Sequence, residues 1–235
     1  MIEEKLQIKK LWTIRKYADD AAYQADRPYE VSEFEGNLLL NEGIAVLLDL
    51  LIGAGTPTNF GNANAYLGVG DGGPTALTGT LSFTGGSAAV TGSGTAFTTE
   101  LAAGDHIYLD SQPGVLATVQ SIESNTGLTL TAVYAGSTGS GASSKILRAI
   151  ATQTALQAAT NKLYKAMEAT FPIRASQTVT WRIVCGSTDA NFAWNEFTVA
   201  NGNSDAADNL NRKVSAQGTK AAGQTWTLDL SLTLS

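Results

Sequence analysis

The sequence lacks most of the side chains on which disulfides, metal sites and acid–base catalysis depend. Its 235 residues include one cysteine, Cys185, and one histidine, His106. One cysteine cannot form an intrachain disulfide, and this pair is too small for a zinc site of the usual Cys/His kind. We therefore predict neither a disulfide framework nor a bound zinc ion.

Charged side chains are also scarce. They make up 15% of the chain, with a formal net charge of −6, against about a quarter in an average globular protein. Basic residues cluster no further than the pairs Lys9-Lys10 and Arg15-Lys16, whereas nucleic-acid-binding domains concentrate Lys and Arg on one face. We predict no direct binding of DNA or RNA.

No hydrophobic run is long enough for a membrane span. The longest, residues 38–52, is interrupted by Asn41, Glu42 and Asp49, while a transmembrane helix needs about 20 apolar residues. The first residues, Met1-Ile-Glu-Glu-Lys5, lack the charged-then-apolar pattern of a secretory signal. We expect a soluble protein without a membrane partner, folded in a reducing cytoplasm.

Small and hydroxyl-bearing residues take the place of the missing charge, and this composition is typical of short strands joined by turns. The clearest strand is residues 224–235, where every second residue is apolar: Trp226, Leu228, Leu230, Leu232 and Leu234. Residues 178–185 alternate in the same way and place Cys185 on the buried face as a small hydrophobe.

Three further strands are predicted with irregular patterns. Residues 5–17 indicate a strand with a bulge or break at Lys9-Lys10, and their inward set is Leu6, Ile8, Trp12 and Ile14. Within residues 191–200 the aromatic parity changes between Trp194 and Phe197, which predicts a bulge at Asn195-Glu196. Residues 163–171 fit both helix and strand spacing, and we favour a strand that ends at Pro172.

One helix is expected, over about residues 38–52, with Asn37 as its N-cap and Gly53 at its end. Its polar residues occupy one narrow sector, and a helix this apolar must be covered on most of its circumference. We predict that it is buried, in the domain core or against a sheet plus a neighbouring chain. The preceding residues 18–35 are polar and predict a surface loop or an arm lying on a neighbouring subunit.

Residues 78–149 differ sharply in composition, because they hold nearly half of the 24 glycines and no tryptophan. Five strand candidates lie there, at residues 79–83, 88–91, 106–109, 117–122 and 128–133. A flexible exit is expected at residues 136–142. We predict a mainly β protein: a β-sandwich-like frame of residues 1–77 and 150–235 with one buried helix, plus a small β-barrel or sandwich module inserted into a loop.

The motifs that carry chemistry are weak. Gly68, Gly70 and Gly73 form a G-x-G-x-x-G pattern, but Pro74 follows where a dinucleotide site needs the start of a helix, so we predict a tight turn. His106 has no nucleophile in a recognisable setting and is expected to be exposed at a strand start. Neither motif predicts a cofactor.

Carboxylates are the remaining route to catalysis or metal binding. Asp189 and Glu196 flank the aromatic segment 192–194, a composition that suits a sugar-cleaving site and also an ordinary sheet. The calcium candidates Asp71, Asp205 and Asp208 lack the loop spacing of a dedicated site. We predict no catalytic, cofactor-binding or metal-binding residues, and hence no enzyme.

The frame resembles proteins encoded in tailed-bacteriophage structural gene clusters. Six segments carry the resemblance in one order: residues 35–43 (EGNLLLNEG), 64–71 (NAYLGVGD), 156–162 (LQAATNK), 192–196 (FAWNE), 210–213 (LNRK) and 226–235. The insert, with residues 90–98 (VTGSGTAFT) and 101–105 (LAAGD), is similar to a small β module found on phage heads, tails and fibres.

The resemblance implies a non-enzymatic virion protein made in the host cytoplasm. One expectation is a capsid decoration, or cement, protein that binds the major capsid protein and stabilises the assembled head. The alternative is a tail or fibre component that binds a receptor or glycan on the host. Low charge suits contacts with other proteins, and we expect a homo-oligomer: a trimer on threefold sites of the shell, or else a monomer until it meets its site.

Overall fold

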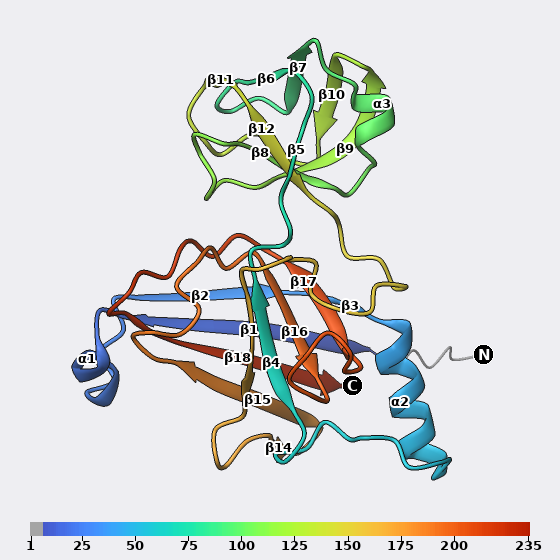
Figure 1. Ribbon diagram of the computed structural model, residues 1–235, viewed down its shortest axis with the longest axis vertical. Helices are drawn as coiled ribbons and strands as arrows, with labels where there is room; N and C mark the ends of the chain where they lie inside the picture. The colour runs from blue at the N-terminus through green and yellow to red at the C-terminus, as the bar shows by residue number, and fades with distance from the viewer. Residues whose placement is uncertain (1–6) are drawn as a thin grey trace. The chain divides into compact units, whose positions relative to one another are not determined.

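The computed structural model describes residues 7–235 and divides the chain into two compact units (Figure 1). Unit 1 contains the residues up to Asp71 and those from Ala149 onward, and unit 2 is Gly72–Arg148. Unit 2 begins earlier than the predicted residue 78 because β5 (Thr75–Ala76) pairs with β12 (Ser143–Ile146). Strands dominate both units, as predicted, and all the strand pairs of the described chain are antiparallel.

Unit 1 contains two five-stranded sheets. The first, sheet A, has the order β14 (Ile173–Ala175), β15 (Thr178–Cys185), β18 (Thr225–Leu234), β1 (Ile8–Tyr17) and β2 (Glu30–Glu35). The second, sheet C, has the order β13 (Lys162–Ala166), β4 (Tyr66–Gly70), β16 (Glu196–Ala200), β17 (Asn211–Val214) and β3 (Leu38–Leu39). Side chains of both sheets form one hydrophobic core, which confirms the sandwich-like frame.

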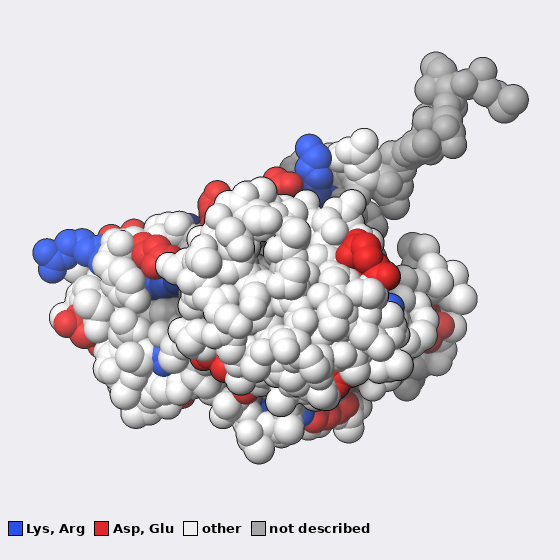
Figure 2. Space-filling model, turned by 90° about the horizontal axis from the view of Figure 1, so that it is seen from above, with Lys and Arg blue, Asp and Glu red and all other residues white. Residues whose placement is uncertain are grey.

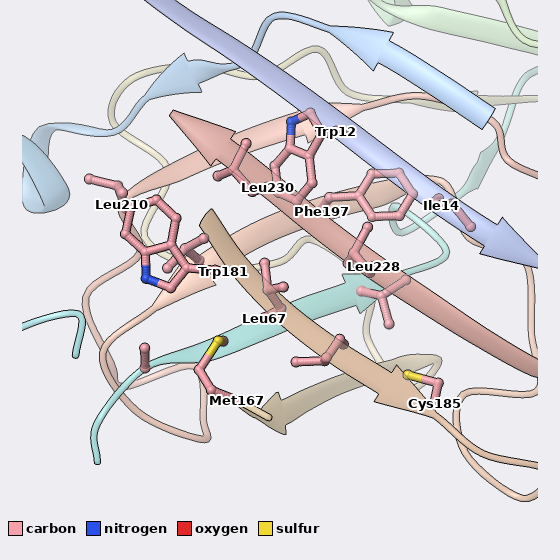
Figure 3. Packing of buried hydrophobic residues seen from close by; sticks show 14 of the residues in the cluster. Trp12, Ile14, Leu67, Met167, Trp181, Cys185, Phe197, Leu210, Leu228 and Leu230 are labelled. Atoms are coloured by element: carbon pink, nitrogen blue, oxygen red, sulfur yellow. The ribbon is translucent and has the colours of Figure 1, made fainter. Parts of the chain in front are cut away.

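The core is built from the alternation of the long strands of sheet A (Figure 3). Among the inward side chains of β18 and β15, Leu228, Leu230 and Ile183 are fully buried, as predicted. Leu67 and Phe197 of sheet C complete this core. Burial decreases toward the end of β18, where Leu234 is 42% exposed.

The bulge or break predicted at Lys9-Lys10 is wrong. Strand β1 pairs with β18 in one unbroken register from Ile8 to Tyr17, and Lys10 keeps the inward parity with its Nζ 3.4 Å from the carbonyl oxygen of Asn37. Leu6 lies outside the described residues. The irregularity predicted at Asn195-Glu196 is present: β16 begins only at Glu196, and the backbone N–H of Asn195 donates to the carbonyl oxygen of Gly70, which is the register partner of Glu196. The predicted strand over residues 163–171 is confirmed in part, as β13.

Residues 18–35 form neither a loop nor an extended arm. They fold into α1 (Asp20–Gln24) followed by β2, which pairs with β1. Asp19 caps the helix by accepting a hydrogen bond from the backbone N–H of Ala22 at 2.7 Å. The backbone N–H of Tyr29 donates to the carbonyl oxygen of Lys16, which returns the chain to the sheet.

Unit 2 has one eight-stranded sheet and its own hydrophobic core. The strand order is β11 (Gly139–Gly141), β6 (Thr80–Phe83), β7 (Ala89–Ser93), β10 (Gly127–Leu130), β9 (Ala117–Ser124), β8 (His106–Leu109), β12 and β5. The five predicted strands are present, and a short helix, α3 (Phe97–Glu100), was not expected. The predicted flexible exit instead contains β11, which pairs with β6, and the sheet does not close into a barrel.

Candidate interaction surface

The helix α2 (Asn41–Ile52) is the most apolar exposed element of the described chain. It starts later than predicted because Leu38 and Leu39 pair with β17 as strand β3, so Asn37 is not its N-cap. It ends where predicted: Gly53 has φ 67°, and its backbone N–H bonds the carbonyl oxygen of Asp49. Glycine adopts this left-handed conformation without the strain that a side chain would cause.

Only a narrow side of α2 contacts the rest of unit 1. A Cβ atom on Gly43 would lie 2.4 Å from the Cα of Leu210, so the absence of a side chain lets the helix approach the backbone. Val46 is buried in the core. Glu42 accepts a hydrogen bond from the backbone N–H of Asn209 at 2.7 Å, and burial raises the pKa of its carboxyl group.

The opposite side of α2 presents large apolar side chains to solvent, so the prediction of a buried helix is wrong for the isolated chain. Leu51 is 79% exposed, Ile52 75% and Leu48 55%, and the remaining exposed members are Ile44, Leu47 and Leu50. We call these six residues the α2 surface. Figure 1 shows α2 at the rim of unit 1 and not between its sheets. Exposed apolar patches of this kind mark protein–protein contacts.

Ile44, Leu48 and Leu51 form one row along α2, at the i, i+4, i+7 spacing of helices that pack on helices. The two acidic residues of the helix lie away from this row: Glu42 faces Asn209, and Asp49 is on the same side of the helical wheel. The row therefore carries no charge that would oppose a second apolar surface.

Unit 2 offers a surface of a different kind. Its 77 residues (72–148) include six Asp, Glu, Lys or Arg residues, and none lies within residues 72–99 or 124–144. Several of the six are engaged: Asp105 pairs with Arg148 at 3.2 Å, and Glu100 accepts from the hydroxyl of Thr78 at 2.6 Å. Figure 2 shows a broad face with few charged atoms. Neutral hydroxyl-bearing side chains dominate the unit.

A fully buried charge pair, Glu196 with Arg212, lies on the outward side of sheet C. Both side chains are fully buried, and Arg212 Nε donates to Glu196 Oε2 at 2.8 Å. The same carboxylate accepts the backbone N–H groups of Gln157 at 2.9 Å and Ala158 at 2.8 Å. Glu196 thus holds the irregular segment 153–158 against the sheet, which is a structural role.

The glycines of the G-x-G-x-x-G pattern make room for this arrangement. A Cβ atom on Gly70 would lie 2.7 Å from Glu196 Oε1, and one on Gly68 would lie 2.6 Å from Thr198 Cγ2. Gly73, with φ +64°, lies in the irregular segment between β4 and β5. The predicted strand is therefore confirmed, but residues 71–74 are irregular and do not form the predicted tight turn.

The other candidates from the sequence do not converge. Asp189 pairs with Lys165 and accepts the backbone N–H of Gly186, apart from the Glu196 pair. Asp71, Asp205 and Asp208 have separate partners, namely Asn161, Lys162 and Asn201. Within residues 7–235, no group of three or more His, Cys, Asp or Glu residues is placed to hold a metal ion.

The single cysteine and the single histidine of the chain have ordinary surroundings. Cys185 is fully buried, as predicted, and burial raises the pKa of its thiol to about 12. His106 stands at the start of β8, half-buried, with its Nδ1 3.1 Å from the hydroxyl oxygen of Thr118. The expectation of an exposed histidine is thus only partly met. Neither residue has the environment of a nucleophile or a general base.

The helices of the described chain are short, and none combines the length and apolar character that crossing a membrane requires. Comparison with known proteins adds no relative from which a role could be carried over. No protein-family model, curated protein or solved structure matches the chain.

Proposed function

We propose that the chain is a structural protein of a tailed-phage virion, and that it decorates the assembled head as a homo-oligomer. The observation that carries the assembly role is the α2 surface, an apolar helix face that residues 7–235 leave largely exposed. The phage assignment rests on the resemblance of the frame and insert segments described above. The occupant that we assign to the α2 surface is the same helix of a second copy.

A second copy suits the α2 surface because the row Ile44, Leu48 and Leu51 is self-complementary and uncharged. Closed symmetry is the usual way in which identical patches cover one another. The exposed fractions of the six side chains correspond to about three fully exposed leucines per copy, or about 5–10 kcal/mol per copy and about 10–20 kcal/mol per pair if all are buried. Association costs are on the order of 4–15 kcal/mol. We therefore expect an oligomer that depends on concentration and strengthens where a shell holds copies together.

The oligomer is tested by light scattering coupled to gel filtration over a range of protein concentrations. Leu51→Glu would put a charge within the contact, and because Leu51 is exposed the fold of unit 1 should not change. The matched control is Val133→Glu, since Val133 is 59% exposed in unit 2. We expect only the α2 variant to lose the concentration-dependent increase in mass. A wild-type mass that stays at one chain, 24.5 kDa, at all concentrations would overturn the assignment of the α2 surface.

The partner is tested separately, by adding the protein to emptied heads that lack it and measuring co-sedimentation and resistance of the heads to heat. Binding to heads with hundreds of copies per particle supports decoration. Co-purification with isolated tails, in a few to a few dozen copies, would replace it with the alternative of a tail or fibre component.

A further inference from the structure

A polar pocket of about 480 Å³ opens on the outward face of sheet A, the side opposite the hydrophobic core. Its floor is formed by side chains of outward parity on the three central strands: Arg182 on β15, Thr227 on β18 and Arg15 on β1. Its size lies within the range of about 300–1,000 Å³ that is typical of small-ligand sites.

One wall of the pocket is formed by residues 20–26, that is, α1 and the two residues that follow it, which we call the α1 segment. Side-chain hydrogen bonds hold this segment over the sheet. The hydroxyl of Tyr17 donates to Asp26 Oδ1 at 3.0 Å, and the hydroxyl of Thr225 donates to Asp20. The rings of Tyr17 and Tyr23 meet edge to face with centroids 5.3 Å apart. Burial, reinforced by the bond to Asp26, raises the pKa of Tyr17 to about 12. The wall is therefore preformed.

Asp229, 5% exposed beneath the pocket, orients both arginines. Arg182 bonds it through two nitrogens, Nε at 2.7 Å and Nη2 at 2.6 Å, whereas Arg15 uses only Nη1, at 3.0 Å. Among residues 7–235, nothing accepts from the Nε and Nη2 of Arg15. This unoccupied edge of the guanidinium group is the one that holds a carboxylate through two parallel hydrogen bonds.

Further donors without a described partner line the same pocket. The hydroxyl of Thr227 is buried and has no hydrogen-bond partner within residues 7–235. The Tyr23 hydroxyl and the Gln24 side-chain amide also line the pocket. Neither donates a hydrogen bond to another group of the described chain. The single carboxylate of the lining, Asp26, already accepts from Tyr17. The free edge of Arg15 can only donate, and these hydroxyl and amide groups can also donate, so a ligand rich in acceptor oxygens would satisfy them.

We infer that this pocket binds the carboxylate group of a small ligand, with the free guanidinium edge of Arg15 as the bidentate donor and the α1 segment as the wall. The inference goes beyond the proposed assembly role and does not depend on it. Planar, two-point recognition distinguishes a carboxylate from a neutral polyol, and Arg15, held by Asp229, pays little ordering entropy on binding.

The test is a titration of isotope-labelled protein followed by NMR, observing the side-chain Nε–H signals of arginine and the backbone amides of α1. The probes are glucuronate, glucose and inorganic phosphate, because the first two differ by a carboxylate in place of a hydroxymethyl group. We expect saturable shifts at Arg15 and α1 with glucuronate, and at least tenfold weaker binding of glucose and of phosphate.

Arg15→Lys keeps the charge beside Asp229 but removes the two-point edge, and we expect it to weaken glucuronate binding at least tenfold. Arg174→Lys is the matched control, since Arg174 is exposed on β14 and bonds only the carbonyl oxygen of Ser176 in the described chain. An unchanged melting temperature shows that both variants fold. Equal binding of glucose or phosphate, unchanged affinity in Arg15→Lys, or the absence of any saturable shift would each overturn the inference.

Discussion

Replacing Glu196 by glutamine should destabilise unit 1 strongly, although the two side chains have the same shape. The substitution removes the charge that pairs with Arg212 at a site where both side chains are fully buried. It also turns one of the two acceptor oxygens, which receive the N–H groups of Gln157 and Ala158, into a donor. Breaking a buried pair from one side costs about 3–5 kcal/mol, because the remaining charge loses its counter-ion. This loss is a large part of a typical unfolding free energy of about 5–15 kcal/mol.

The assay is urea unfolding followed by tryptophan fluorescence. All four tryptophans, Trp12, Trp181, Trp194 and Trp226, belong to unit 1, so the signal reports this unit alone. Asp205→Asn is the matched control, because Asp205 pairs with Lys162 where both side chains are partly exposed, 48% and 21%, and such pairs contribute about 0–1 kcal/mol. If both variants lose the same small free energy, segment 153–158 is not held by the buried pair and the reasoning is refuted.

Three further predictions concern stability and reactivity. Leu230→Asp places a carboxylate in the core at a fully buried position. Burying an unpaired polar group costs about 2–7 kcal/mol of folding free energy, so we expect insoluble expression. A soluble variant with an unchanged melting temperature would contradict this. Replacing residues 72–148 by a short Gly-Ser linker should leave unit 1 with a cooperative melt monitored by its tryptophans, whereas loss of the transition would show that the units do not fold separately. The thiol of Cys185, with its pKa raised to about 12 by burial, should resist a thiol-specific reagent at pH 8 until urea unfolds the chain; its stabilising effect is present below the ordinary thiol pKa and is lost as pH rises from about 9 toward 12.

The strands with one apolar face were predictable from the sequence alone. In β18 and β15 the side chains alternate between core and outward face, so period-two patterning identifies both the element and the residues that it buries. Patterning was less informative where a polar residue takes an inward position. Lys10 lies at the rim of the core and reaches a backbone carbonyl oxygen, and the sequence suggested a break there that does not exist.

The start of α2 and its exposure could not be predicted, for different reasons. Leu38 and Leu39 pair with residues of β17 that lie far away in the sequence, and this contact overrides their helical spacing. Composition correctly indicated a helix with too much apolar surface for one contact. It could not tell whether the cover belongs to the same chain, and in the described chain most of that surface is exposed.

The pocket on sheet A was missed because it depends on register. Alternation places Arg182, Asp229 and Arg15 on the outward faces of three separate strands, which the sequence alone suggests. Bringing them together requires the pairing of Arg182 with Asp229 and of Asp229 with Thr13, and this alignment was not predictable without the structure. The lesson applies to polar outer faces in general: a strand pattern names the candidates, and the register between strands selects those that meet.

The anchoring of the chain around unit 2 has a consequence for the evolution and engineering of this protein. The departing chain is tied to sheet C at Gly70 and Asp71, whose carbonyl oxygens accept from the backbone and the side-chain amide of Asn195. The returning chain is tied through Glu196 to the N–H groups of Gln157 and Ala158. Both attachment points are secured by unit 1 itself. Unit 1 is therefore suited as a scaffold for insertions, in which a peptide epitope or another small domain could replace unit 2.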